Sequence, residues 1–98
     1  MALTYLDDSG NASQTAARVA ACGRKSLALQ SDIREEVAVE ACFDGVAEAI
    51  GRPDILVNSA GINMAGIEVA DMELSRWNDM MKTDLSGTFL TCRRFVRA

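Results

Sequence analysis

The stretch DILVNSAGI, residues 54–62, decides the fold class of this chain. Its first half is apolar without polar alternation, which is typical of a strand covered on both faces, as in a parallel sheet. The apolar run then stops in small or polar residues, namely Asn58, Ser59, Ala60 and Gly61. This change of composition indicates that a buried strand opens into a loop at this point.

A first strand and helix are expected near the start of the chain. Residues 2–6 form a short β-leaning run that closes in the turn cluster DDSGN. Asn11 is expected to cap the following helix, which ends before Gly23. The helix is rich in alanine, so its axis can lie close to a sheet. Its expected buried residues are Ala12, Ala16, Val19 and Ala20.

A second strand and helix follow directly. The run SLALQS, residues 26–31, is expected to be a strand. Asp32 and Glu35 have the spacing of a capping box, and Gly51 and Pro53 end the helix that begins there. Its apolar residues step by four, three and four positions and so lie on one helical face. They are Val39, Phe43, Val46 and Ile50.

The remaining segments complete the pattern of an α/β fold. An irregular connection follows residue 62, and a helix is expected from about Ser75 onward. Strands alternating with helices are the signature of a parallel sheet with flanking helices. Ligands bind such sheets at the carboxyl ends of the strands. A binding site is therefore expected among residues 5–8, 31–33 and 58–62.

Composition and charge narrow the classes of protein to which the chain can belong. The 98 residues are 49% hydrophobic and 24% charged, as in one small globular domain. The net charge of -4 gives no basic footprint for a nucleic acid. No apolar run reaches the roughly 20 residues that span a bilayer, and the N-terminus has no signal-peptide pattern. We therefore expect no nucleic-acid or membrane partner and a cytoplasmic location.

The cysteines are not expected to carry chemistry. Cys22, Cys42 and Cys92 are odd in number and widely spaced, and the chain contains no histidine. This argues against a disulfide framework and against a Cys/His metal site, so no metal is predicted. Each cysteine lies in an apolar helical pattern and is expected to be a small buried residue. The lack of histidine also excludes a Ser/His or Cys/His pair within the chain.

Three motifs carry a resemblance to a known family. Asn58 to Gly61 is similar to the Asn-Asn-Ala-Gly motif of the short-chain dehydrogenase/reductase family. Residues 31–33, Ser-Asp-Ile, resemble the Asp-Val pair at the end of the family's third strand. Residues 77–94, WNDMMKTDLSGTFLTCRR, resemble its fifth helix, written W-x-x-x-x-x-x-N-x-x-G-x-F. The motifs occur in the family's order and on the expected elements.

The resemblance implies a fold, an activity and a cofactor. It implies that residues 1–98 are part of a single NAD(P)-binding Rossmann domain, with its second to fourth strands in a parallel sheet. The parent would be an oxidoreductase that transfers a hydride between a nicotinamide cofactor and an alcohol or carbonyl substrate. A non-catalytic nucleotide-binding or regulatory α/β module is the alternative.

The resemblance implies a cofactor-binding role for the four residues after the apolar run. The loop of Asn58, Ser59, Ala60 and Gly61 would let the adenosine ribose pass close to the backbone, because small side chains leave the space free. Asn58 would tie neighbouring strands through its amide. Ser59 replaces the family's second Asn and keeps one donor and acceptor. An ordinary turn, in which Asn and Gly are common, is the other interpretation.

The adenine end of the site is expected after the second run. Asp32 resembles the residue that accepts a hydrogen bond from the adenine amino group, and the backbone N–H of Ile33 would bind the same ring. A plain helix cap at Asp32 is the alternative. Tyr5 and Leu6 match neither the acid nor the Arg that selects NAD or NADP. Asp7, with its neighbouring acid, would repel a phosphate dianion and so favours NAD, although a solvated turn explains it equally well.

Asp84 departs from the family pattern at a catalytic position. The family has an Asn there, which holds a water and the active-site Lys in a proton relay. An Asp accepts the same hydrogen bonds but adds a charge and loses the donor, which would alter the pKa of that Lys. Asp84 is therefore a catalytic candidate. A polar residue on a half-exposed helix is the alternative.

The C-terminal helix is a candidate for a homo-oligomer interface. Gly87 costs a helix about 1 kcal/mol relative to Ala, which close approach of another backbone would explain. The resemblance suggests that Gly87, Trp77 and Phe89 pack against a partner subunit, and packing within one subunit is the alternative. Arg93 and its neighbours Arg94 and Arg97 are expected to complement the helix dipole.

The family's remaining motifs do not occur in these 98 residues. The T-G-x-x-x-G-x-G loop that receives the pyrophosphate, the catalytic Ser and the Tyr-x-x-x-Lys are missing, and the only tyrosine is Tyr5. We therefore expect an internal fragment of a family member. Alone, it is expected neither to form the family's sheet with native stability nor to bind NAD(P).

Overall fold

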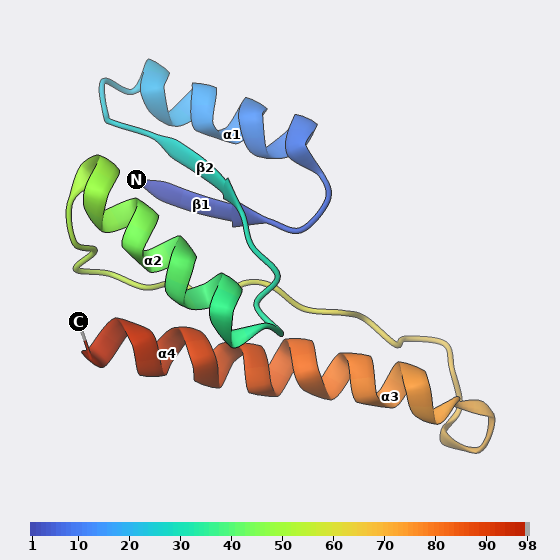
Figure 1. Ribbon diagram of the computed structural model, residues 1–98. Coiled ribbons are helices and arrows are strands. Elements are labelled where there is room, and N and C mark those ends of the chain that lie inside the picture. The colour runs from blue at the N-terminus through green and yellow to red at the C-terminus, as the bar shows by residue number, and fades with distance from the viewer. Residues whose placement is uncertain (98) are drawn as a thin grey trace.

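The computed structural model describes residues 1–97. Figure 1 shows α1 on one face of a short sheet and α2 on the other, with one long helical rod lying beyond α2. The elements in chain order are β1 (Ala2–Tyr5), α1 (Ser9–Ala21), β2 (Leu27–Gln30), α2 (Glu36–Ile50), η1 (Val69–Asp71), α3 (Leu74–Met80), η2 (Met81–Gly87) and α4 (Thr88–Arg97).

The strands confirm the predicted parallel α/β class. β1 and β2 pair in parallel, with Ala2 opposite Leu27 and Tyr5 opposite Gln30. The ladder continues past the strands, because the Ser31 N–H donates to the Tyr5 carbonyl at 2.9 Å. Both carboxyl ends therefore lie at the same edge, and the connections to α1 and α2 begin there, as Figure 1 shows.

Residues 54–58 are not a strand, so this part of the prediction was wrong. The sheet of the described residues has two strands, and residues 54–58 are irregular chain outside it. Ile55 and Val57, expected to be buried, are 82% and 79% exposed. A strand forms only where a neighbour supplies its hydrogen bonds. In residues 1–97, no segment pairs with 54–58.

The start of α1 lies earlier than predicted. Asp8 is the N-cap, and its Oδ1 accepts a hydrogen bond from the Asn11 N–H at 3.1 Å. The Asn11 amide donates to the other Asp8 oxygen at 2.6 Å. These hydrogen bonds from Asn11 lower the pKa of Asp8. Asn11 is therefore a partner of the cap and not the cap itself, because the acid ahead of it is the stronger acceptor for the first N–H groups.

The far end of α1 matches the prediction more closely. Gly23 follows the C-cap Cys22 with φ of 77°, a left-handed conformation in which Gly is favoured. Ala12 is buried, whereas Ala20 is exposed. The two-stranded sheet covers only part of the helix, so the predicted stripe is buried toward its beginning.

α2 carries the buried core of the chain. Val39 and Val46 are buried, which confirms the predicted apolar face. The helix begins at Glu36 after Glu35, which makes no side-chain capping bond. The expected capping role of Asp32 is therefore wrong, because its carboxylate is taken by Arg34.

The rod formed by α3, η2 and α4 is held against the first half of the chain. Arg94 on α4 reaches Glu40 and Asp44 on α2 at 2.7 and 2.8 Å, and Arg93 pairs with Glu36. Arg93 and Arg94 thus pair with carboxylates of α2, beyond the dipole interaction expected of them. A chain of ion pairs fixes the rod along α2.

The cysteines differ from the expectation. Cys42 is half-buried, but Cys22 and Cys92 are exposed. Burial raises the pKa of the Cys42 thiol, and a hydrogen bond with Ser31 opposes this effect. No disulfide joins the three cysteines in the structure.

Candidate functional site

Three segments that are far apart in sequence meet at the carboxyl edge of the sheet. They are the turn after β2, the loop that contains Gly61, and η2. η2 is the element shared by the other two, because its Asp84 contacts the Gly61 loop and its Gly87 contacts Ile33. The turn that contains Asp32 and Ile33 and the loop predicted to pass a ribose are therefore held on the same element.

Gly87 permits the closest of these approaches. A Cβ added at Gly87 would lie 2.7 Å from both Cγ1 and Cδ1 of Ile33, and 3.2 Å from its carbonyl oxygen. Real Cβ atoms do not approach other atoms so closely, so Gly is required while Ile33 keeps this position. The cost of Gly in this helical rod is therefore explained by packing within the chain. Gly87 is buried and is not available to a partner subunit through this face.

Asp84 on η2 contacts the loop that contains Gly61. Its Oδ1 accepts a hydrogen bond from the Ile62 backbone N–H at 2.8 Å. A Cβ on Gly61 would lie 3.2 Å from the same oxygen, tighter than ordinary contact. The small residue at 61 therefore lets the loop descend onto the carboxylate. The contact uses the acceptor that Asp and Asn have in common.

The backbone around Asp84 is not an ordinary α-helix. Met81 to Gly87 form a π-helical segment between α3 and α4. Such segments are rare and often occur at functional sites, because the wider turn shifts side chains around the helix. Thr88 follows it and donates its hydroxyl to the Asp84 carbonyl at 3.0 Å. This widened turn presents Asp84 and Gly87 to two different segments.

Asn58 ties the loop to α4 and not to neighbouring strands. Its Oδ1 accepts a hydrogen bond from the Thr91 hydroxyl at 2.6 Å, and its Nδ2 donates to the Cys92 sulfur at 3.3 Å. The predicted strand-tying role was wrong, because residues 54–58 have no strand beside them among the described residues. Ser59 and Ala60, between Asn58 and Gly61, are exposed.

Asp32 lies at the end of β2 with its carboxylate fixed by Arg34. The side-chain hydrogen bonds from Arg34 lower the pKa of Asp32, and partial burial opposes them. Asp32 is therefore ionised at neutral pH and can only accept hydrogen bonds. Arg34 was not singled out in the sequence. Its position two residues after an acid was the available signal, since an Arg there can fold back onto the carboxylate.

Asp7 is the least integrated of the predicted site residues. It follows β1 at the same edge, is exposed, and accepts a hydrogen bond at its carbonyl from the Ser9 N–H at 3.2 Å. In the part of the chain that the structure describes, no hydrogen bond or ion pair joins Asp7 to Asp32, Gly61 or Asp84.

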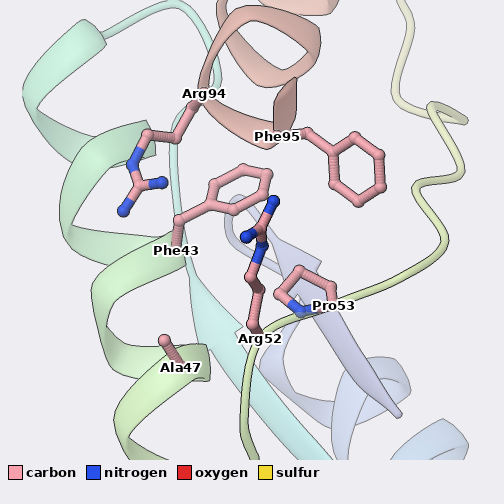
Figure 2. A pocket seen from close by; sticks show the side chains of 6 residues that line it. All are labelled: Phe43, Ala47, Arg52, Pro53, Arg94 and Phe95. Atoms are coloured by element: carbon pink, nitrogen blue, oxygen red, sulfur yellow. The ribbon is translucent and has the colours of Figure 1, made fainter. Parts of the chain in front are cut away.

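A cavity lies elsewhere, toward the opposite edge of the sheet. Figure 2 shows it between the second half of α2 and the end of α4. It has a volume of about 160 Å³ and is lined by Phe43, Ala47, Arg52, Pro53, Arg94 and Phe95. These residues follow the chain away from the carboxyl edge, so the cavity is separate from the site at Asp32 and Gly61.

Two classes of feature are not found in residues 1–97. No three His, Cys, Asp or Glu side chains lie close enough together to hold a metal ion. Across the same residues, none of the helices has the length and apolar character needed to cross a membrane.

Comparison with known proteins identifies relatives over almost the entire chain. Residues 1–98 match the family described as enoyl-(acyl carrier protein) reductase. The chain is 31% identical over 93 residues to 3beta-hydroxysteroid dehydrogenase 1 of Eggerthella lenta, covering 94% of this chain and 35% of that protein. It is 43% identical over 63 residues to D-threitol dehydrogenase of Mycolicibacterium smegmatis, covering 63% of this chain and 24% of that protein.

The fold is matched equally well. A short-chain dehydrogenase from Burkholderia cenocepacia J2315, crystallised in complex with NADP, superimposes with a TM-score of 0.90 at 34% identity. The match covers 98% of this chain and 39% of that one. The chain thus spans little more than a third, at most, of each of these three relatives. Sequence, fold and the meeting of the three motifs agree, and the chain belongs to the short-chain dehydrogenase/reductase family.

Proposed function

We propose that this chain supplies the adenosine half of the dinucleotide site of an NAD(P)-dependent oxidoreductase. The observation that carries the proposal is the meeting of the Asp32 turn and the Gly61 loop on η2. In this proposal Asp32 accepts a hydrogen bond from the adenine amino group, and the Ile33 N–H donates to the same ring. The loop of Asn58, Ser59, Ala60 and Gly61 passes under the ribose.

The electrostatics of the edge support an adenosine ligand. Asp32 is held ionised, so it is an acceptor suited to the amino group of adenine. The loop residues that would face a ribose are small, and Asn58 anchors the loop through Thr91. A ligand would therefore meet a rigid backbone with few side chains in its way.

We propose that the cofactor is NAD or NADP. The preference for NAD that Asp7 suggested receives no support from the Burkholderia relative, which was crystallised with NADP. Asp7 is exposed and can turn to solvent, so its repulsion of a 2′-phosphate would be screened. A comparison of the affinities for the two dinucleotides measures the preference directly.

The hydride chemistry is proposed for the whole protein and not for these residues alone. A bound nicotinamide would accept or give the hydride, and an alcohol or carbonyl compound would be the substrate. Asp84 is the one family catalytic position in the chain, and its carboxylate also holds the Ile62 N–H. Without a Tyr-x-x-x-Lys or a Gly-rich phosphate loop, residues 1–98 are proposed to be inactive and not to bind NAD(P) alone.

A second proposal concerns self-association. Apolar side chains along the rod are exposed, among them Trp77, Leu85 and Phe89. An apolar row of this kind is typical of a subunit interface. Gly87 takes no part, because it packs on Ile33. In the whole protein, a Leu85→Glu variant should sediment with a lower mass than the unsubstituted protein. An unchanged mass would refute the interface.

The binding site can be tested in a chimera. Residues 1–98 would replace the matching 39% of the Burkholderia dehydrogenase, a host that binds NADP. Calorimetry should detect saturable NADP binding to the chimera and none to residues 1–98 alone. Replacing Asp32 by Asn should weaken binding about tenfold, the effect of losing one charged hydrogen bond. A Glu48→Gln variant, at an exposed acid on α2, is the matched control and should bind like the parent chimera.

Three outcomes would contradict the proposal. A chimera that melts cooperatively but binds no dinucleotide would show that these residues do not form the adenosine half. Saturable NADP binding by residues 1–98 alone would refute the proposed dependence on the missing phosphate loop. A chimera that binds through a phosphate loop alone would be unaffected by Asp32→Asn, which also argues against the site.

A further inference from the structure

The carboxylate of Asp32 is held by one arginine along both of its oxygens. Oδ1 accepts hydrogen bonds from the backbone N–H and Nε of Arg34, at 3.0 and 2.9 Å. Oδ2 accepts from Nη2 at 2.7 Å and, at a longer 3.2 Å, from Nε. The planar guanidinium therefore fixes the plane of the carboxylate as well as its position.

After these four contacts, the Asp32 carboxylate can still accept one further hydrogen bond. An ionised carboxylate can accept about four hydrogen bonds, two at each oxygen. Oδ1 uses both of its directions in short bonds, whereas Oδ2 has one short bond and one long bond that shares Nε with Oδ1. Oδ2 of Asp32 is thus the oxygen that can take a further donor at little cost. The arginine decides which oxygen that is.

Arg34 is itself held by a second element. Its Nη1 lies 3.8 Å from Oδ1 of Asp79 on α3. The guanidinium therefore links the end of β2 to the helical rod, and its side chain is only 30% exposed. Arg34 is not a freely moving surface residue.

We propose that Arg34 is the positioning residue that makes this site select adenine through its 6-amino group, an inference that rests on the proposed function. The 6-amino group donates, whereas the 6-oxo group of hypoxanthine accepts. A carboxylate oxygen fixed in direction favours the donor and repels the 6-oxo group. Without Arg34 the Asp32 carboxylate can rotate and be hydrated, so it discriminates less between the two bases.

The chimera allows the selectivity to be measured as a ratio. Its affinity for NADP is compared with that for nicotinamide hypoxanthine dinucleotide phosphate, in which a 6-oxo group and an N1–H replace the 6-amino group and the N1 acceptor of adenine. Arg34→Gln should lower the ratio about tenfold, mostly by weakening NADP, since a charged hydrogen bond loses its orientation. Arg34→Lys keeps the charge without the planar fork and should give an intermediate ratio. Arg24→Gln, at an exposed arginine after α1, should leave the ratio unchanged.

The outcomes separate this inference from other roles of Arg34. An arginine that only stabilises the fold would weaken both dinucleotides alike, so an unchanged ratio in both variants overturns the proposal. A higher ratio overturns it as well, because it would mean that Arg34 competes with adenine for Asp32. If the parent chimera binds neither dinucleotide, the proposed function fails and the inference fails with it. A chimera that binds both equally overturns the inference alone.

Discussion

Replacing Gly87 by Ala should destabilise the chain although it improves helix propensity. The new methyl would lie 2.7 Å from Cγ1 and Cδ1 of Ile33. Overpacking of this kind costs about 1–3 kcal/mol. The gain from replacing Gly inside a helix is about 1 kcal/mol. The net loss of unfolding free energy is therefore expected to be about 1 kcal/mol.

The effect of Gly87→Ala on stability should change sign when the Ile33 side chain is shortened. In an Ile33→Ala background both clashing atoms are gone, and of the three nearest atoms the Ile33 carbonyl oxygen remains, at 3.2 Å. Gly87→Ala should then be neutral or stabilising by up to about 1 kcal/mol. The two substitutions together should show a coupling energy of about 1–3 kcal/mol.

A double-mutant cycle by urea denaturation of the chimera measures this coupling. The parent, the two single variants and the double variant are followed by far-UV circular dichroism. Arg24→Gln provides an unrelated surface control with no expected effect. A coupling energy near zero, or a Gly87→Ala variant more stable than the parent, would refute the packing of Gly87 against Ile33.

Three further predictions concern ionisable groups. Asp84→Asn in the chimera should keep the loop in place, because the Asn oxygen can still accept a hydrogen bond from the Ile62 N–H. The substitution should nevertheless change the pH profile of the turnover rate. An unchanged profile removes Asp84 from the mechanism. Arg34 lowers the folded-state pKa of Asp32, so the stability that this ion pair contributes is lost as the pH falls through that lowered pKa. On acidification, the Arg34→Gln chimera should therefore lose less unfolding free energy than the parent chimera. Equal losses of unfolding free energy would contradict the pairing. Because burial raises the pKa of Cys42, iodoacetamide at pH 8 should label this thiol more slowly than that of exposed Cys92. Peptide mass spectrometry measures the two labelling rates. Equal rates would contradict the burial of Cys42.

The helices and the paired strands could be predicted from local patterns. Val39 and Val46 lie on the apolar face that the spacing indicated, and Gly23 ends α1 as expected. Such features depend on residues within one or two helical turns of each other. The sequence therefore contains most of the information that determines them.

Features that depend on a distant partner could not be predicted in the same way. The apolar run 54–58 has strand composition, but no described segment pairs with it, and Ile55 remains exposed. Some local features were also missed, such as the cap of α1, which is Asp8 and not the expected Asn11. The pairing of Asp32 with Arg34 was missed as well, because the spacing of Asp32 and Glu35 matched a helix cap equally well.

The segments of the candidate site could be singled out from the sequence, but the contacts between them could not. Asp32, Ile33 and Gly61 were singled out, and the structure brings their segments together through η2. The π-helical turn that makes this possible has no local sequence signature. The bond from Thr91 to Asn58 joins residues 33 positions apart, which only the tertiary structure can specify.

Amide chemical-shift mapping of the ¹⁵N-labelled chimera tests most directly where a dinucleotide binds. On addition of NADP, the amides of Ile33 and Gly61 should shift in a saturable manner. Those of Phe43 and Ala47, which line the separate cavity, should remain unchanged. Shifts confined to Phe43 and Ala47, or saturable binding that leaves Ile33 and Gly61 unmoved, would contradict the assignment of the adenosine half to this edge of the sheet.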